Sequence, residues 1–147
     1  MLTTVDYFDL GLLCLGRNNI PVFAVNIGAM DGITYDELIG YSNAFNHSVL
    51  YVEPIPHLFE ELKKNITLPN AYFENSAISD VSGTVEMMYI DPDVIRAGAV
   101  HLCFKGMSSI IPPRNGLGSE GDKYVVEQYS KKITVPSITF EQLMSKY

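Results

Sequence analysis

Three short stretches of this chain carry residues that could together hold a nucleoside. The turn Gly28-Ala29-Met30-Asp31-Gly32 begins and ends in glycine, which lacks a Cβ, so the backbone there can turn sharply and approach a ligand closely. Glu53 follows 21 residues after Gly32, and its carboxylate can accept hydrogen bonds from both hydroxyls of a ribose. The stretch from Asn75 to Asp80 supplies small and polar side chains that could edge an adenine. In this order and at this spacing, the three stretches predict a nucleoside-containing ligand.

Each of these stretches follows or closes a segment whose pattern indicates a buried β-strand. Residues 20–27 form a continuous apolar run, which is typical of a strand buried on both faces of a parallel sheet. We expect a second strand at Ser48–Val52, and Ala71–Ile78 predicts a third strand together with its exit. In open α/β sheets the ligand crevice lies outside the carboxyl ends of the strands, so the three stretches should meet at one edge of the sheet.

Helices are expected between these strands. Thr34 and Glu37 have the form of a capping box, in which both side chains satisfy free backbone N–H groups at the start of a helix. Pro56 suits the first turn of the next helix, where its missing N–H costs nothing. The order strand–helix–strand–helix–strand predicts an α/β fold with parallel pairing and right-handed crossovers.

The second half of the chain has a different pattern. Residues 84–90 predict a strand in an antiparallel or edge position, and Lys132–Val135 predicts another short strand. The segment between them is rich in glycine and proline from Asp91 to Gly121, which predicts a loop with a short helix near Pro92–Gly98. Thr139 and Gln142 form a second capping box, which predicts a helix at the end of the chain.

Length and charge restrict the class of protein. A chain of 147 residues suffices for one domain over residues 1–147. The net charge of −7 argues against nucleic-acid binding, because phosphate contacts need a surplus of Lys and Arg.

The sequence gives no sign of membrane insertion or export. No apolar run is long enough to span a membrane. Cys14 and Cys103 match no metal or redox spacing, which suits a reducing cytoplasm. Asp6 and Asp9 stand where a signal peptide would have Lys or Arg. Residues 1–19 should instead hold an N-terminal amphipathic helix, because apolar residues recur at helical spacing between Val5 and Leu15.

The composition of the glycine turn bears on the choice of cofactor. A dinucleotide-binding turn has the form Gly-x-Gly-x-x-Gly, and its middle glycine lets the backbone approach a pyrophosphate. That glycine is missing from Gly28-Ala29-Met30-Asp31-Gly32. The turn therefore favours S-adenosylmethionine, which contains no phosphate, while an NAD-dependent oxidoreductase stays an alternative.

Several motifs resemble those of one known family. Val25–Gly32 resembles the first motif of the FkbM family of S-adenosylmethionine-dependent methyltransferases, and Val52–Pro56 resembles its second. Residues 75–83 resemble the third motif, and Thr134–Leu143 is similar to the strand and helix that follow in that family. The resemblance implies a Rossmann-like class I methyltransferase fold and methyl transfer, usually to the oxygen of a small molecule or a sugar.

The resemblance also assigns roles to residues. Gly28 would approach the cofactor, Glu53 would hold the ribose, and Ser76 and Ala77 would lie beside the adenine. The full set of cofactor-binding residues that we expect is Asn26, Gly28, Ala29, Asp31, Glu53, Pro54, Ser76 and Ala77. No residue stands out as a catalytic base, and no metal site is expected.

Two features of the chain depart from the family pattern. The family usually has an acidic residue where this chain has Asn26. The helix at Thr139 leads, in the family, into a further buried strand that is not present before Tyr147. We therefore expect the N-terminal portion of the fold, with a non-catalytic or incomplete nucleoside-binding module as the alternative to an active enzyme. A homodimer is one way to cover the sheet edge that such a fragment would expose.

Overall fold

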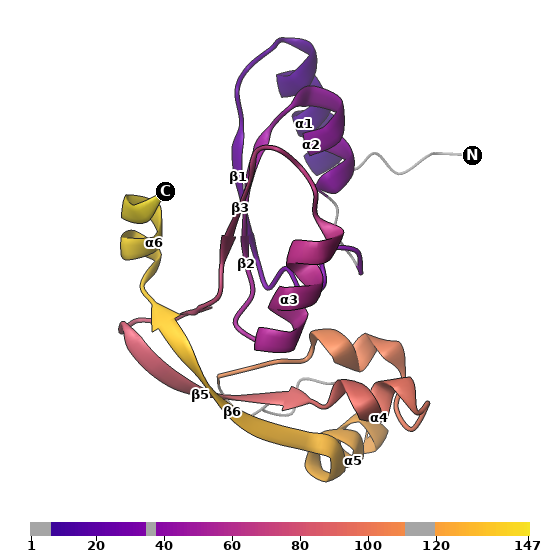
Figure 1. Cartoon of the computed structure of the whole chain (residues 1–147). Coiled ribbons are helices and arrows are strands. Elements are labelled where there is room, and N and C mark those ends of the chain that lie inside the picture. Colours follow the sequence, from indigo (N-terminus) through magenta and orange to yellow (C-terminus); the bar gives the residue numbers. More distant parts are fainter. Residues whose placement is uncertain (1–6, 35–37, 111–119) are drawn as a thin grey trace, which may run out of the picture. The chain divides into compact units, whose positions relative to one another are not determined.

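The structure, a computed structural model, describes residues 7–34, 38–110 and 120–147. These residues form an α/β protein that contains two three-stranded sheets (Figure 1). The chain divides into two compact units, Met1–Glu74 and Asn75–Tyr147, and each unit is described by itself. Along the described residues, no helix is both long and apolar enough to cross a membrane.

The first unit is a parallel α/β unit. Its sheet has the order β1-β2-β3, and both strand pairs are parallel, as the alternation of strands and helices predicts. In register, Phe23 pairs with Ser48, and Val49 pairs with Ala71. The elements, in chain order, are α1 (Tyr7–Arg17), β1 (Phe23–Ile27), α2 (Ile39–Phe45), β2 (Ser48–Val52), α3 (Pro56–Asn65) and β3 (Ala71–Glu74).

The middle strand β2 forms the core of this unit. Four consecutive residues, Val49 to Val52, have 0 % exposed surface, which is the burial expected for a central strand of a parallel sheet. Val49 and Tyr51 pack with Leu62 and Ile66 of the α3 segment, and the Tyr51 ring stacks on the Phe73 ring with centroids 5.9 Å apart. One face of the sheet is therefore covered by helical side chains.

The two helices after the first strands begin differently from each other. Pro56 occupies the first turn of α3, as expected from its missing N–H. In contrast, α2 begins at Ile39 rather than at Thr34, and its N-cap Leu38 makes no side-chain cap hydrogen bond. The Thr34 hydroxyl donates instead to the Asp31 carboxylate at 2.9 Å. Glu37, the other half of the expected capping box, lies outside the described residues.

Helices α1 and α2 pack closely because of a glycine. A Cβ added at Gly16 would lie 2.3 Å from Cγ of Phe45, which is far inside van der Waals contact. Gly16 therefore lets the Phe45 ring of α2 approach the backbone of α1.

The second unit is built around a long antiparallel pair. Its sheet has the order β4-β6-β5; β5 pairs antiparallel with β6 from Gly83–Ser137 to Ile90–Ser130, and the short β4 pairs with β6 in parallel. The expectation of an antiparallel or edge strand at residues 84–90 is confirmed. The elements are β4 (Ala77–Ile78), β5 (Gly83–Ile90), α4 (Pro92–Arg96), the 3-10 helix η1 (Leu102–Gly106), α5 (Glu120–Tyr129), β6 (Ser130–Ile138) and α6 (Phe140–Lys146).

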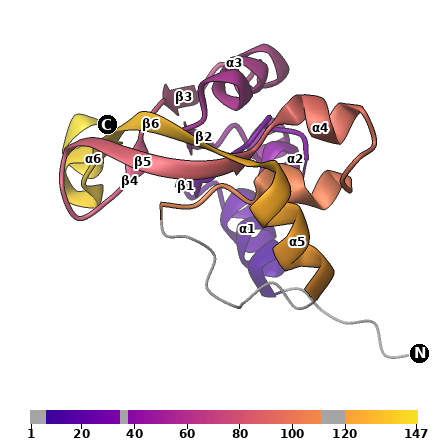
Figure 2. The same ribbon diagram turned by 90° about the horizontal axis from the view of Figure 1, so that it is seen from below.

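Two connections in this unit differ from the sequence expectation. Helix α5 runs directly into β6 with no residue between Tyr129 and Ser130 (Figure 2). The loop expected from Asp91 to Gly121 contains the 3-10 helix η1 and the first residues of α5, as well as the short helix α4 that was expected. Residues 111–119 of that segment lie outside the described part.

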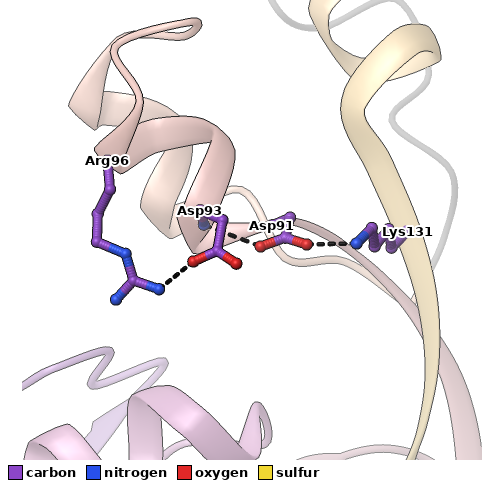
Figure 3. Close-up of polar contacts among 4 residues, drawn as sticks. All are labelled: Asp91, Asp93, Arg96 and Lys131. Carbon is purple, nitrogen blue, oxygen red and sulfur yellow. Dashed lines mark hydrogen bonds and ion pairs between the residues drawn. The ribbon is translucent and has the colours of Figure 1, made fainter.

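Short-range polar contacts hold the ends of the helices in the second unit. Asp91 caps α4 by accepting a hydrogen bond from the Asp93 amide at 2.9 Å, and its other carboxylate oxygen pairs with Lys131 of β6 (Figure 3). Asp93 pairs with Arg96 one turn further along α4. The contact with Asp91 raises the pKa of Lys131 above its usual value. Thr139 caps α6 by accepting from the Gln142 amide at 3.2 Å, which is one half of the predicted capping box. The reciprocal half is replaced, because the Thr139 amide donates to the Ser82 hydroxyl at 3.3 Å, and that hydroxyl in turn donates to Oε1 of Gln142.

Candidate functional site

The turn after β1 is tied to the end of β2. The amides of Gly28 and Ala29 both donate to the carbonyl oxygen of Val52, at 2.9 and 3.1 Å. Gly28, Met30 and Gly32 all have positive φ, at +80°, +53° and +73°. Such angles are routine for glycine and uncommon for other residues. The turn therefore follows a path that the two glycines make accessible.

The two glycines of the turn have different surroundings. A Cβ at Gly28 would meet no atom within 4 Å, so this glycine faces open space. A Cβ at Gly32 would lie 2.6 Å from Cδ1 of Leu62 and 2.7 Å from Cγ1 of Ile66. Gly32 therefore allows the turn to pack on α3, whereas the backbone at Gly28 is open to a ligand.

Glu53 holds the turn in place. Its side chain is 3 % exposed, and Oε2 accepts from the Met30 amide at 2.9 Å while Oε1 accepts from the Ile55 amide at 2.8 Å. The first bond crosses from the end of β2 to the turn after β1, and the second closes the turn that leads into α3. Met30 has a bulky side chain and a positive φ, and the hydrogen bond from its amide to the Glu53 carboxylate stabilises this backbone conformation.

Burial changes the protonation of Glu53. Desolvation raises the pKa of its carboxyl to about 6 from 4.5, and the backbone hydrogen bonds from Ile55 and Met30 oppose this rise. Near neutral pH the group is still mostly a carboxylate. A carboxylate has about four lone-pair positions, and the two backbone bonds take one on each oxygen.

Buried carboxylates follow each strand of the first sheet. Asp31 lies after β1, Glu53 follows β2, and Glu74 is the last residue of β3; these three side chains are 8 %, 3 % and 8 % exposed. The Glu53 amide donates to the carbonyl oxygen of Glu74 at 3.0 Å, which fixes the ends of β2 and β3 against each other. Because all three strands are parallel, this edge of the sheet gathers negative charge.

Asp31 acts within the turn itself. Its Oδ1 accepts from the amides of Ile33 and Thr34 at 3.1 and 2.8 Å, and its Oδ2 accepts from the Thr34 hydroxyl at 2.9 Å. Its carbonyl oxygen accepts from Nδ2 of Asn65 at 2.8 Å. Asp31 therefore shapes the chain after the turn and connects it to the end of α3.

The remaining predicted residues of the first unit lie around this edge. Asn26 is half-buried on β1, where it is in register with Tyr51 on the sheet face that α3 covers. Ala29 is 4 % exposed, and its side chain belongs to the apolar core. Pro54 is buried between Glu53 and Ile55. Of these three, only Asn26 offers a polar side chain.

Ser76 and Ala77 belong to the second unit. They are 6 % and 3 % exposed, and Ala77 pairs with Ser137 where β4 meets β6. The structure thus brings together the predicted residues from Asn26 to Pro54 within one unit and places the adenine-side pair in the other.

Sequence reasoning did not find two features of this site. One is Glu74, which the pattern assigns to a strand without a chemical role; its position at the end of β3 was the available signal. The other is the pair of backbone bonds made by Glu53, which depend on the path of the turn. Within the residues that the structure describes, no group of three or more His, Cys, Asp or Glu side chains could hold a metal ion.

Comparison of the chain with protein-family models, with curated proteins and with solved structures finds no match.

Proposed function

We propose that the edge formed by the carboxyl ends of β1, β2 and β3 binds S-adenosylmethionine, and that the chain is the cofactor-binding part of a Rossmann-like methyltransferase of the FkbM type. One observation carries this proposal. An open glycine, Gly28, lies at the same sheet edge as the buried carboxylate of Glu53, whose Oε2 receives the amide of Met30 in the same turn. This is the arrangement that a ribose-containing ligand needs, with backbone that can be approached beside an acceptor for hydroxyl groups.

The charge of the edge supports S-adenosylmethionine over NAD. The cofactor carries a sulfonium, an ammonium and a carboxylate group, so its net charge is positive, and the carboxylates of Asp31, Glu53 and Glu74 attract its two cationic groups. The pyrophosphate of NAD would be repelled by the same groups. The missing middle glycine in the turn points in the same direction.

The residues of this sheet edge then have different parts in binding. Gly28 leaves room for the cofactor, and Glu53 accepts from the ribose hydroxyls while its backbone bonds keep it in position. The backbone of Asp31 and Gly32 contributes indirectly, because it packs on α3 and thereby holds the turn in position. Asn26 supplies an amide in place of the acidic residue that the resemblance leads one to expect.

The reaction that follows from this proposal is methyl transfer to an oxygen. The methyl group passes from the sulfonium sulfur to a hydroxyl oxygen of a small molecule or glycan, the S–CH₃ bond breaks, and the hydroxyl proton goes to solvent. The products are S-adenosylhomocysteine and a methyl ether. The protein's contribution is orientation, since an in-line displacement between held reactants gains most from positioning.

Isothermal titration of the full chain with S-adenosylmethionine, S-adenosylhomocysteine and NAD tests the proposal. We expect the first two to bind and NAD not to bind. Gly28→Ala should lower the affinity for S-adenosylhomocysteine by about tenfold or more, because the methyl group of the introduced alanine enters the open space beside the turn. A preference for NAD, or no binding of S-adenosylhomocysteine, contradicts the proposal.

Gly98→Ala is the matched control for this experiment. Gly98 has φ +72°, close to the +80° of Gly28, and a Cβ there also meets nothing within 4 Å. It lies in the second unit after α4. Both variants should lose similar stability, whereas only Gly28→Ala should lose affinity. An equal loss of affinity in both variants would mean that the effect comes from general destabilisation.

Binding and turnover are separated by a second measurement. Transfer of a labelled methyl group to a panel of hydroxylated small molecules and glycans reports an active enzyme. Cofactor binding without transfer to any acceptor would favour the non-catalytic module instead.

A further inference from the structure

Strand β1 has an edge that lacks the usual protection against pairing with another chain. It is the first strand in the order β1-β2-β3, and no strand formed by the described residues pairs with its outer side. Natural sheets commonly protect such edges with charged residues, with proline or by keeping the strand very short. The opposite edge strand, β3, has four residues and ends in Glu74, whereas β1 is longer and contains neither a charge nor a proline. The outer side of β1 is therefore open to a further strand.

The backbone of β1 presents hydrogen-bonding groups to this open side. Val22 and Gly28, which flank the strand, both bond to residues of β2. Alternate residues of a strand direct their amide and carbonyl groups to the same side, so the even-numbered residues from 22 to 28 bond to β2. The amide and carbonyl groups of Phe23, Val25 and Ile27 therefore point outward. The side chains of these three residues share one face of the sheet, and Phe23 and Ile27 are 41 % and 52 % exposed.

A second copy of the same strand fits this edge. When two β1 strands lie antiparallel across a twofold axis at Val25, Phe23 of each copy lies directly opposite Ile27 of the other. The residues with outward backbone groups then all occupy hydrogen-bonded positions of the ladder, where each pair exchanges two bonds. A shift of the register by one residue would place Phe23 opposite Asn26, whose backbone groups already bond to β2. The open edge therefore matches itself in one register.

The distribution of charge favours contact between two copies at this edge. The chain has a net charge of −7, so two copies repel each other where acidic surfaces meet. Residues 18–30 contain no charged residue, and β1 lies inside this stretch. The pairing of Phe23 with Ile27 also joins an aromatic and a β-branched side chain, a combination that stabilises antiparallel strands. The uncharged edge thus allows a contact that the net charge disfavours elsewhere.

We propose that β1 pairs with β1 of a second copy of this chain, antiparallel and with Val25 on the twofold axis, so that the two three-stranded sheets join into one continuous sheet. The outer strands of the joined sheet are then the two copies of β3, which are short and end in Glu74. The contact uses only the outer side of β1 and does not depend on the cofactor proposed above.

Sedimentation velocity of the full chain over a range of concentrations tests this interface. A single pair of strands is a small contact, so we expect a reversible equilibrium between monomer and dimer. Amide hydrogen exchange of the same samples should show that Phe23, Val25 and Ile27 gain protection as the dimer forms, whereas Ala24 and Asn26, whose amides bond to β2, change little. A chain that remains a monomer at about 1 mM would overturn the proposal and leave the edge to another partner. Dimerisation without protection of the three outward amides would also overturn it.

Two double variants test the register. Phe23→Lys with Ile27→Glu places opposite charges directly across the twofold axis and should still dimerise. Phe23→Lys with Ile27→Lys places like charges there and should dimerise about tenfold more weakly than the first double variant. Both remove the same two exposed apolar side chains, and the second has the smaller net negative charge, so general repulsion cannot account for its weaker pairing. Circular dichroism verifies that both fold, and equal dimerisation of the two would overturn the proposal.

Tyr72→Lys is the matched control. Tyr72 lies on β3, on the same face of the sheet as Phe23, and is similarly exposed at 45 %. The two rings lie 5.9 Å apart, centroid to centroid. The control should dimerise as the unchanged chain does, because β3 forms the other edge of the sheet. Loss of the dimer in Tyr72→Lys would place the second copy on the face of the sheet instead of at the β1 edge and would overturn the proposal.

Discussion

Strands β2 and β6 are both middle strands of three-stranded sheets, but they bury different shares of their side chains. In β2, Val49 to Val52 are all 0 % exposed. In β6, only Val135 and Ser137 of nine residues are buried, at 1 % and 7 %. Strand β6 instead has an antiparallel neighbour along eight register pairs. The first unit is therefore stabilised largely by side-chain packing, and the second more by backbone pairing and helix caps.

This comparison predicts that substitutions in the first unit cost more than those in the second. The following variants are ordered by the size of their expected effect, and each one can contradict the comparison or make it more exact.

Gly32→Ala should have the largest effect. Its methyl group must enter the space of Leu62 and Ile66 at a backbone angle of +73°, so strain and overpacking add. We expect a loss of about 2–5 kcal/mol in the free energy of unfolding, measured by urea denaturation. Gly28→Ala carries the strain alone and should lose about 1–2 kcal/mol. Equal losses would mean that the packing of the turn on α3 contributes little.

Glu53 should make the stability of the first unit depend on pH. Its pKa is raised to about 6 in the folded protein, so ionisation of its carboxyl opposes folding. Its contribution is unfavourable above pH 6 and disappears as the pH falls through 6 towards 4.5. The change is about 2 kcal/mol, from 1.36 kcal/mol per pKa unit. Urea denaturation between pH 4.5 and 7 should show this rise in the unchanged protein on acidification but not in Glu53→Gln. Parallel pH profiles for the two proteins would rule out this origin.

Gly16→Ala and Gly11→Ala form a pair within one helix. A Cβ at Gly16 meets the Phe45 ring, while a Cβ at Gly11 meets nothing within 4 Å. Gly16→Ala should destabilise the protein by about 1–2 kcal/mol, since overpacking exceeds the gain in helix propensity. Gly11→Ala should stabilise it by about 0.5–1 kcal/mol. Thermal unfolding followed by circular dichroism would give opposite shifts for the two variants, and shifts of the same sign would argue against close packing of α1 on α2.

Thr139→Ala tests the second unit and should have the smallest destabilising effect. It removes the hydroxyl that accepts from the Gln142 amide at the start of α6, and loss of an N-cap costs about 1 kcal/mol. Thr139→Ser keeps the hydroxyl and should stay close to the unchanged protein. A loss larger than that of Gly32→Ala would contradict the difference between the units.

Local patterns predicted the elements of the first unit better than those of the second. The continuous apolar run before Gly28 and the segment Ser48–Val52 gave the positions of β1 and β2. Burial on both faces, which such runs indicate, holds for the central strand β2 but was wrong for β1, because β1 lies at the edge of the sheet and Phe23 and Ile27 are 41 % and 52 % exposed. The pairing of β5 with β6 joins Ile90 to Ser130, and no local pattern specifies a partner at that distance along the chain.

The candidate site was predictable as a set of residues but not as a geometry. Gly28 and Glu53 could be found from their types and spacing at strand ends. The backbone hydrogen bonds that the Glu53 carboxylate accepts could not be predicted, because the Met30 amide reaches the carboxylate only from a backbone at positive φ. Thr34 is a second example, since its hydroxyl donates a hydrogen bond to the Asp31 carboxylate instead of capping the start of α2.

The direct junction between α5 and β6 has a consequence for how the gene can vary. Residues rotate by about 100° per position in a helix and alternate by 180° in a strand, so each element fixes the phase of the next when no linker separates them. One codon inserted between Tyr129 and Ser130 would either rotate Val125 of α5 away from the apolar cluster that it packs against or move Val135 to the opposite face of β6. Insertions and deletions in related genes should therefore avoid this junction, although substitutions at the exposed positions of β6 can accumulate.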